Sequence, residues 1–170
     1  PGLYFTAETD ELSRTSYVWR SPRGDVIRVM RQLGTGFQSE YRDYDALGRM
    51  IGVSDAGGAA WANQYDMLGN RLSASDPDLG TWTYQYNSVN QLISQTDARG
   101  VRTGLTYDKA GRLLQRRIVS PIVPDPLLTD NIYDEAERSY YNAGRLTTSR
   151  NGARTQEFDY SADGALQRTI

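Results

Sequence analysis

The pattern that decides the fold reads YDALGRMI from Tyr44, YDMLGNRL from Tyr65, YNSVNQLI from Tyr86 and YDKAGRLL from Tyr107. The four tyrosines are spaced 21 residues apart. Helical repeats need about 33 to 45 residues per unit, so this period excludes a helical solenoid. The repeat therefore predicts an array of short units of a single kind.

Each unit contains turn sequences of one type. The quadruplets are DALG at Asp45, DAGG at Asp55, DMLG at Asp66, NSVN at Asn87, DARG at Asp97 and DKAG at Asp108, with the longer DPDLG at Asp76. Asp or Asn at the first position of a type I turn accepts a hydrogen bond from the backbone two residues on. Gly or Asn at the fourth takes the left-handed conformation that closes a bulged hairpin. About six residues separate the turns, the usual strand length, so each unit is predicted to be two strands and two turns.

We expect three residues of each unit to be structural: the tyrosine, the acid or amide after it, and the turn glycine. They are Tyr44, Asp45, Gly48, Tyr65, Asp66, Gly69, Tyr86, Asn87, Tyr107, Asp108 and Gly111. The residue six positions after the tyrosine is Met50, Leu92 or Leu113 in three units and Arg71 in the fourth. A four-residue turn makes this residue face the tyrosine across the hairpin, a contact of about 0.2–1 kcal/mol.

The chain divides into four predicted regions. Residues 1–43 are predicted to form divergent β-hairpins, and residues 44–118 contain the regular repeats. Residues 119–139 contain three prolines and an acidic run, which predict an irregular loop. Residues 140–170 contain further repeats, YYNAGRL from Tyr140 and YSADGAL from Tyr160. We expect about 14 strands in one antiparallel meander.

A meander of this size needs a particular shape. Fourteen strands about 4.8 Å apart form a ribbon about 65 Å wide, and six residues per strand make it only about 20 Å tall. Open twisted sheets rarely exceed about 10 strands, so the ribbon is expected to coil, to close into a barrel or to fold into a sandwich. A coiled wall leaves free edge strands that favour pairing with another chain or with more of the same structure.

Composition excludes several classes of function. The 19 basic and 21 acidic residues give a net charge of −2, which removes the electrostatic case for a nucleic-acid partner. The absence of His and Cys excludes Ser-His-Asp catalysis, zinc sites built from these residues, and disulfides. No apolar run is long enough to predict a membrane span. The opening Pro1-Gly2-Leu3 does not resemble a signal peptide.

The repeats resemble a known family. YDALGRM, YDMLGNRL and YDKAGRLL, joined by SDPDLGTWTYQY and SQTDARG, are similar to the YD repeats of bacterial RHS-repeat proteins. The resemblance is strong over residues 44–118, weaker over 133–170 and loose over 1–43. In that family the repeats form a long sheet that spirals into a hollow shell around a C-terminal toxin domain. Such shells occur in Tc-type insecticidal toxins, type VI secretion effectors and related polymorphic toxins.

The resemblance implies a section of shell wall, with no enzyme activity and no cofactor or metal, in a protein that bacteria secrete or deliver outside the cell for competition or insecticidal virulence. Its implied partners are the rest of the shell and an enclosed toxin domain. The alternative is a cell-surface module that binds carbohydrate or protein. Trp61, Trp82 and Tyr84 are the candidate carbohydrate platform, although aromatic residues on strands more often pack against neighbouring strands. A closed barrel or sandwich that folds alone is a further alternative.

Overall fold

An aspartate shapes the turn after the repeat tyrosine in three of the four regular repeats in this computed structural model of the chain. Asp45 Oδ1 accepts hydrogen bonds from the N–H groups of Leu47, at 2.9 Å, and Arg49, at 3.0 Å. The N–H of Gly48 donates to the Asp45 carbonyl at 3.0 Å. Gly48 has a φ of 80°, which lies in the left-handed region that glycine tolerates without strain. The turn therefore has the chemistry expected of an Asp-x-x-Gly sequence.

Two asparagines build the same turn in the third repeat. Asn87 Oδ1 accepts hydrogen bonds from the N–H groups of Val89, at 3.1 Å, and Gln91, at 2.9 Å. Asn90 stands at the glycine position with a φ of 62°. Asparagine enters the left-handed region more readily than other residues with a side chain. An amide pair can thus replace the aspartate and the glycine.

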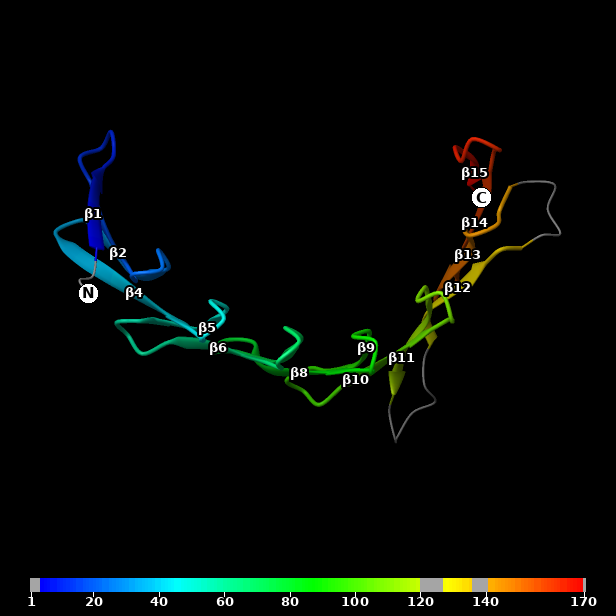
Figure 1. The fold of residues 1–170 in the computed structure, drawn as a ribbon, viewed down its shortest axis with the longest axis horizontal. Helices are drawn as coiled ribbons and strands as arrows, with labels where there is room; N and C mark the ends of the chain where they lie inside the picture. The colour runs from blue at the N-terminus through cyan, green and yellow to red at the C-terminus, as the bar shows by residue number, and fades with distance from the viewer. Residues whose placement is uncertain (1–3, 120–126, 136–140, 170) are drawn as a thin grey trace. The chain divides into compact units, whose positions relative to one another are not determined.

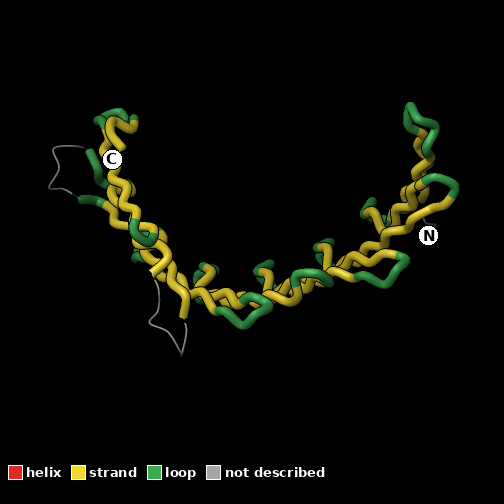
Figure 2. The backbone as a smooth tube through the Cα atoms, turned by 180° about the vertical axis from the view of Figure 1, so that it is seen from behind, coloured by secondary structure: helices red, strands yellow, loops and turns green. Residues whose placement is uncertain are grey.

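The structure describes residues 4–119, 127–135 and 141–169, which contain strands, turns and irregular segments and no helix (Figure 2). The chain forms two compact units, Pro1–Thr83 and Tyr84–Ile170. The first unit contains β1 (Tyr4–Thr9), β2 (Thr15–Arg20), β3 (Val26–Leu33), β4 (Gly36–Tyr44), β5 (Met50–Asp55), β6 (Ala60–Tyr65) and β7 (Arg71–Asp76), and β8 (Gly80–Tyr86) includes the boundary between the units. The second unit contains β9 (Leu92–Thr96), β10 (Arg102–Tyr107), β11 (Leu113–Val119), β12 (Leu127–Tyr133), β13 (Leu146–Asn151), β14 (Arg154–Tyr160) and β15 (Leu166–Thr169).

Within each unit, consecutive strands pair antiparallel in chain order (Figure 1). The chain is therefore the all-β antiparallel meander that the repeat predicts, with fifteen strands among the described residues. Short turns suffice for such connections because antiparallel neighbours meet at the same end of the sheet. Alternate turns consequently lie along the same edge.

The register places each tyrosine opposite the residue six positions later. Tyr44 is the Cα partner of Met50, and Tyr107 is the Cα partner of Leu113. A β-bulge immediately precedes the tyrosine in both hairpins. In the Tyr65 hairpin the partner is Arg71. The cross-strand pairing thus follows the spacing that the sequence predicts in these three units.

Each unit is a single layer with almost no apolar interior. Among the described residues, Val29, at 6% exposure, is the one hydrophobic side chain in the buried class. Buried polar residues are more numerous: Ser39, Ser94, Thr103, Asn142, Thr147, Thr148 and Asp159. A sandwich requires a continuous apolar face between two sheets, so the sandwich alternative is wrong for each unit.

The structure corrects two predictions about the last third of the chain. Residues 127–133 form β12 rather than part of an irregular loop, whereas residues 120–126 and 136–140 lie outside the described part. The repeat tyrosine that the structure describes in this region is Tyr133, whose Cα partner is Leu146, whereas the predicted Tyr140 lies outside the described part. The N–H of Asp134 donates to the Arg145 carbonyl at 3.1 Å, so an insertion inside the turn separates the aspartate from the arginine. The inserted sequence contains a second tyrosine, Tyr140, which is why the sequence predicts the start of the repeat there instead of at Tyr133.

Candidate functional site

One edge of each unit carries the turns that follow the repeat tyrosines, and we call it the YD edge. In the first unit it consists of residues 21–25, 45–49 and 66–70, and in the second it includes residues 87–91, 108–112 and 161–165. These turns are the most regular polar feature of the chain. Because the meander places them side by side within a unit, side chains can reach from one turn to the next.

Tyrosine hydroxyls connect four of the repeats to the strand before them. The Tyr44 hydroxyl donates to the Val26 carbonyl at 3.0 Å, and the Tyr107 hydroxyl donates to the Leu92 carbonyl at 2.8 Å. The same bond recurs from Tyr133 to the Leu113 carbonyl at 3.0 Å and from Tyr160 to the Leu146 carbonyl at 3.1 Å. The repeat tyrosine therefore satisfies a backbone acceptor at the start of the preceding strand, in addition to its predicted cross-strand contact.

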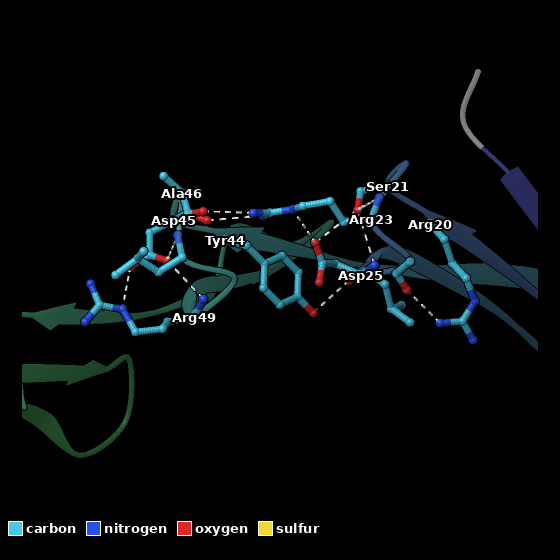
Figure 3. Close-up of polar contacts among 11 residues, drawn as sticks. Arg20, Ser21, Arg23, Asp25, Tyr44, Asp45, Ala46 and Arg49 are labelled. Carbon is cyan, nitrogen blue, oxygen red and sulfur yellow. Dashed lines mark hydrogen bonds and ion pairs between the residues drawn. The ribbon is translucent and has the colours of Figure 1, made fainter. Parts of the chain in front are cut away.

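Arginines connect consecutive turns of the YD edge in the first unit. Arg23 reaches the next turn (Figure 3), where its two terminal nitrogens donate to the carbonyls of Ala46, at 2.9 Å, and Asp45, at 3.2 Å. Arg49 continues the series. Its Nε donates to Asp45 Oδ2 at 2.6 Å, and its Nη1 donates to the Asp66 carbonyl at 2.6 Å. Each guanidinium thus spans two turns, which its planar set of donors allows.

Arg112 repeats this arrangement in the second unit. Its Nε donates to Asp108 Oδ2 at 2.6 Å, and its Nη2 donates to Asp134 Oδ2 at 2.7 Å. Its guanidinium carbon also lies 4.4 Å from the centre of the Tyr133 ring, within the range of a cation–π interaction. Arg145 lies over the Tyr160 ring in the same way, at 5.0 Å. The arginine of the YD-x-x-GR sequence therefore contacts its own aspartate or the tyrosine of the next repeat, and Arg49 and Arg112 contact both.

Sequence reasoning missed this role of arginine. The readable signal is the arginine that directly follows a turn glycine, at Arg49, Arg112 and Arg145. Position alone does not reveal its contacts. Arg49 reaches residues 16 and 17 positions away, and these become neighbours only when alternate turns line up along one edge.

The turn geometry favours ionised aspartates. Backbone hydrogen bonds from Arg49 and Arg112 are the largest influence that lowers the pKa of Asp45 and Asp108, respectively. The amide of Asn70 lowers the pKa of Asp66. The hydrogen bonds that Arg112 donates to Asp134 and, next in size, to Asp108 raise the pKa of the Arg112 guanidinium. The YD edge thus carries fixed, paired charges, and the lowered pKa of Asp45, Asp66 and Asp108 is the opposite of the raised pKa that a general acid needs.

The candidate platform residues lie on β6 and β8. Trp61 is 37% exposed, and its indole Nε1 donates to Asp76 Oδ2 at 2.8 Å. Trp82 is half-buried and is the Cα partner of Ala74, and Tyr84 occupies the next position but one on the same strand. Trp61 lines a surface hollow together with residues of β3, β4 and β5, whereas neither Trp82 nor Tyr84 lines that hollow.

A different aromatic cluster lies on β1 to β4. The ring of Trp19 stacks on Phe5 with centroids 6.0 Å apart, and Tyr17 lies 6.0 Å from Phe37. The Arg28 guanidinium carbon is 4.7 Å from the centre of the Trp19 ring. Residues 1–43 gave no sequence signal for this cluster because the register of these hairpins decides which rings share a face.

The described residues contain no group of three His, Cys, Asp or Glu side chains arranged to hold a metal ion. No helix in the part of the chain that the structure describes is long and apolar enough to cross a membrane.

Comparison with protein families identifies the repeats. The model described as RHS Repeat matches residues 44–81 and 86–118. The chain contains RHS repeats over these residues. These boundaries fall within the regular repeats predicted from residues 44–118, and the matched segments contain Tyr44, Tyr65, Tyr86 and Tyr107 with the turns that follow them. No curated protein matches the chain.

Solved structures share the fold of this chain. A crystal structure of TcdB2-TccC3-Cdc42 matches with a TM-score of 0.80 at 19% sequence identity, and it covers 98% of this chain and 10% of the solved chain. TcdB2-TccC3 matches with a TM-score of 0.80 at 20% identity, over the same shares of the two chains. TcdB2-TccC3 without its hypervariable C-terminal region matches with a TM-score of 0.79 at 19% sequence identity, and the match covers 98% of this chain and 10% of the solved chain. The chain therefore spans about a tenth of the length of the solved chains that it matches.

Proposed function

We propose that the chain forms a segment of the wall of an RHS-repeat shell that encloses a toxin domain. The observation that carries this proposal is the fold match, which extends over 98% of this chain but only 10% of the TcdB2-TccC3 chains. Almost every residue of the segment thus has a counterpart in a much longer structure of the same fold. A repeat array grows by adding like units to its ends, and a wall needs many such units.

The edge of the first unit supports a role within a larger sheet. Within the described part of this unit, β1 pairs on one side only, with β2, and all six of its residues are exposed. Unpaired backbone groups of such a strand form hydrogen bonds readily with another strand. We infer that the partner at this edge is more of the shell.

The YD edge supplies the stiffness that a single-layer wall requires. Because each unit lacks an apolar interior, the arginine and tyrosine links between repeats carry more of the cohesion than they would in a layered protein. Arg49 and Arg112 hold neighbouring turns in place, and Tyr44 and Tyr107 hold neighbouring strands. A wall of this kind acts by separating an enclosed polypeptide from the producing cell until the protein is delivered outside it, and no wall residue needs to react.

Electron microscopy tests the proposal on the protein expressed with the sequence that flanks this chain in its gene. A hollow body with this segment in its wall is the expected result, and a solid particle would contradict it. Limited proteolysis provides a second measurement. The C-terminal domain should resist protease when it is expressed with the repeats and should be digested when it is expressed without them, whereas equal digestion would show that the repeats enclose nothing.

A further inference from the structure

The hollow beside Trp61 gathers side chains from four strands on one face of the first unit. Cα partnerships connect Arg31 to Gln38, Glu40 to Asp55, and Val53 to Trp61. Partners in an antiparallel pair project to the same face, and all six residues line one hollow. Val53 contributes apolar surface, Trp61 contributes a ring, and the other four contribute polar groups.

The indole of Trp61 is held in a defined orientation. Its Nε1 donates to Asp76 Oδ2 at 2.8 Å, and the ring remains 37% exposed. Val53 lies opposite Trp61 across the β5–β6 pair. The exposed face of a fixed indole is a stacking surface whose negative charge density attracts the slightly positive C–H groups of a ligand.

Two polar side chains at this hollow have donor or acceptor atoms that make no hydrogen bond among the described residues. Asp55 Oδ1 accepts bonds from Gly57 and Ala59 N–H, at 2.8 and 3.0 Å, but Asp55 Oδ2 has no hydrogen-bond partner among the described residues. The Gln38 amide likewise makes no hydrogen bond within the described part of the chain. A carboxylate oxygen accepts, whereas an amide both donates and accepts, so together they match adjacent hydroxyl groups.

The charges around the hollow balance locally. Glu40 Oε1 accepts a hydrogen bond from Arg42 Nε at 2.6 Å, and Glu40 Oε2 lies 3.6 Å from Arg31 Nη1. Of the lining residues, Arg31 is a cation and Glu40 and Asp55 are anions, and Arg42 beside them is paired with Glu40, so the hollow has no excess of positive charge and favours a neutral ligand. Its volume of about 190 Å³ is below the roughly 300–1,000 Å³ of sites for drug-sized ligands. One small ring fits this space better than a peptide segment.

We propose that this hollow binds a single neutral pyranose ring of a carbohydrate, stacked on Trp61 with its hydroxyl groups bonded to Asp55 and Gln38. This proposal goes beyond the wall function and does not depend on it. It also narrows the aromatic platform considered from the sequence, because Trp82 and Tyr84 do not line the hollow. A ligand of about a dozen heavy atoms at a shallow site should bind with a Kd of about 1 mM.

NMR of the tryptophan indole N–H signals tests the proposal. The 170-residue chain is titrated with four neutral methyl pyranosides: the glucoside, the galactoside, the mannoside and the N-acetylglucosaminide. At least one sugar should shift the Trp61 signal saturably. No saturable shift up to 50-fold the expected Kd, with any of the four sugars, would overturn the proposal. A methyl glucuronide that binds tenfold more tightly than every neutral sugar would also overturn it, because that result requires a cationic site.

Matched variants separate a stacking site from a general change in the sheet. Trp61→Ala and Gln38→Ala should each weaken binding at least tenfold, as followed by the backbone amide shifts of the hollow, while Trp61→Phe retains part of the affinity. Trp82→Phe is the control, since Trp82 lies outside the hollow, and its Kd should equal that of the unmodified chain. Equal affinity in the Trp61→Ala and unmodified chains, with both shown to be folded by circular dichroism, would contradict the proposal.

Discussion

The guanidinium carbon of Arg49 lies 4.9 Å from the centre of the Tyr65 ring in the next repeat. The same side chain is bonded to Asp45 within its own turn and to the Asp66 carbonyl beside Tyr65. One arginine thus joins the turn of one repeat to the tyrosine and turn of the next. This relationship makes cohesion along the YD edge a property of neighbouring repeats rather than of isolated hairpins.

Replacement of Arg49 by lysine should therefore destabilise the first unit by about 1 kcal/mol, because an ammonium cannot bond both turns while it lies over the Tyr65 ring. The measurement is the free energy of unfolding from a urea titration. Arg99→Lys is the matched control, since Arg99 is 82% exposed and pairs with Asp97 of its own turn, and exposed pairs contribute little. An equal effect of both substitutions would contradict the role assigned to Arg49.

The turn glycines provide a second test. Gly69 has a φ of 93°, and a Cβ added there would meet no atom within 4 Å. Gly69→Ala should therefore cost about 1–2 kcal/mol through backbone strain alone, and Gly69→Asn should cost less because Asn90 already occupies the equivalent position with a φ of 62°. Gly36→Ala is the control without a left-handed backbone and should be neutral or slightly stabilising. Urea titrations that rank alanine and asparagine equal at position 69 would contradict the strain argument.

The local parts of the fold could be predicted from the sequence, whereas contacts between repeats could not. Asp45 and Gly48 specify a turn within five residues, so the strands between such turns follow directly. The contacts of Arg49 depend on the alignment of turns along an edge, which no short sequence encodes. Tyr133 was missed because an insertion broke the period of 21 residues and placed a competing tyrosine at position 140.

In the candidate sites, too, single residues could be predicted from the sequence but their contacts across strands could not. Trp61 stood out in the sequence as an aromatic residue on a strand, but its neighbours Gln38 and Asp55 come from β4 and β5 and become visible only through the register. The cluster of Phe5 and Trp19 was not predicted at all, because residues 1–43 lack the repeat that fixes register elsewhere. Register determines which faces share side chains, so sites built across strands need the structure.

The turn aspartates should make the free energy of unfolding depend on pH in the acidic range. Hydrogen bonds lower the pKa of Asp45, Asp66 and Asp108 below the ordinary value of 3.8. A carboxyl with a lower pKa in the folded than in the unfolded state stabilises the fold fully above the unfolded value, and this stabilisation is lost as the pH falls through the folded value. The urea midpoint should therefore stay level from pH 7 to about 5 and fall steeply below about pH 4.

Asp66→Asn is the variant that isolates this effect. Asn87 forms the same turn as Asp66, and its Nδ2 donates to the Gln91 side chain at 2.7 Å. An asparagine at position 66 should therefore form the turn and bond to the Asn70 side chain in the same way. The variant should keep its stability at pH 7 and lose less than the unmodified chain between pH 4 and pH 2. Parallel loss in both proteins over that range would show that Asp66 does not contribute to the acid dependence.

The tyrosine hydroxyls give the most local prediction, because removal of one oxygen changes one bond. Tyr107→Phe leaves the Leu92 carbonyl without the donor that lies 2.8 Å away and should cost about 0.5–1.5 kcal/mol. Tyr133→Phe should cost less, since the Leu113 carbonyl also accepts a hydrogen bond from Asn131 Nδ2 at 3.1 Å. Tyr65→Phe is the control, because the Tyr65 hydroxyl makes no hydrogen bond among the described residues, and its stability should be unchanged. Urea unfolding of the three variants side by side should give this order, and a loss at Tyr65 as large as that at Tyr107 would show that the hydroxyl bond is not what stabilises the repeat.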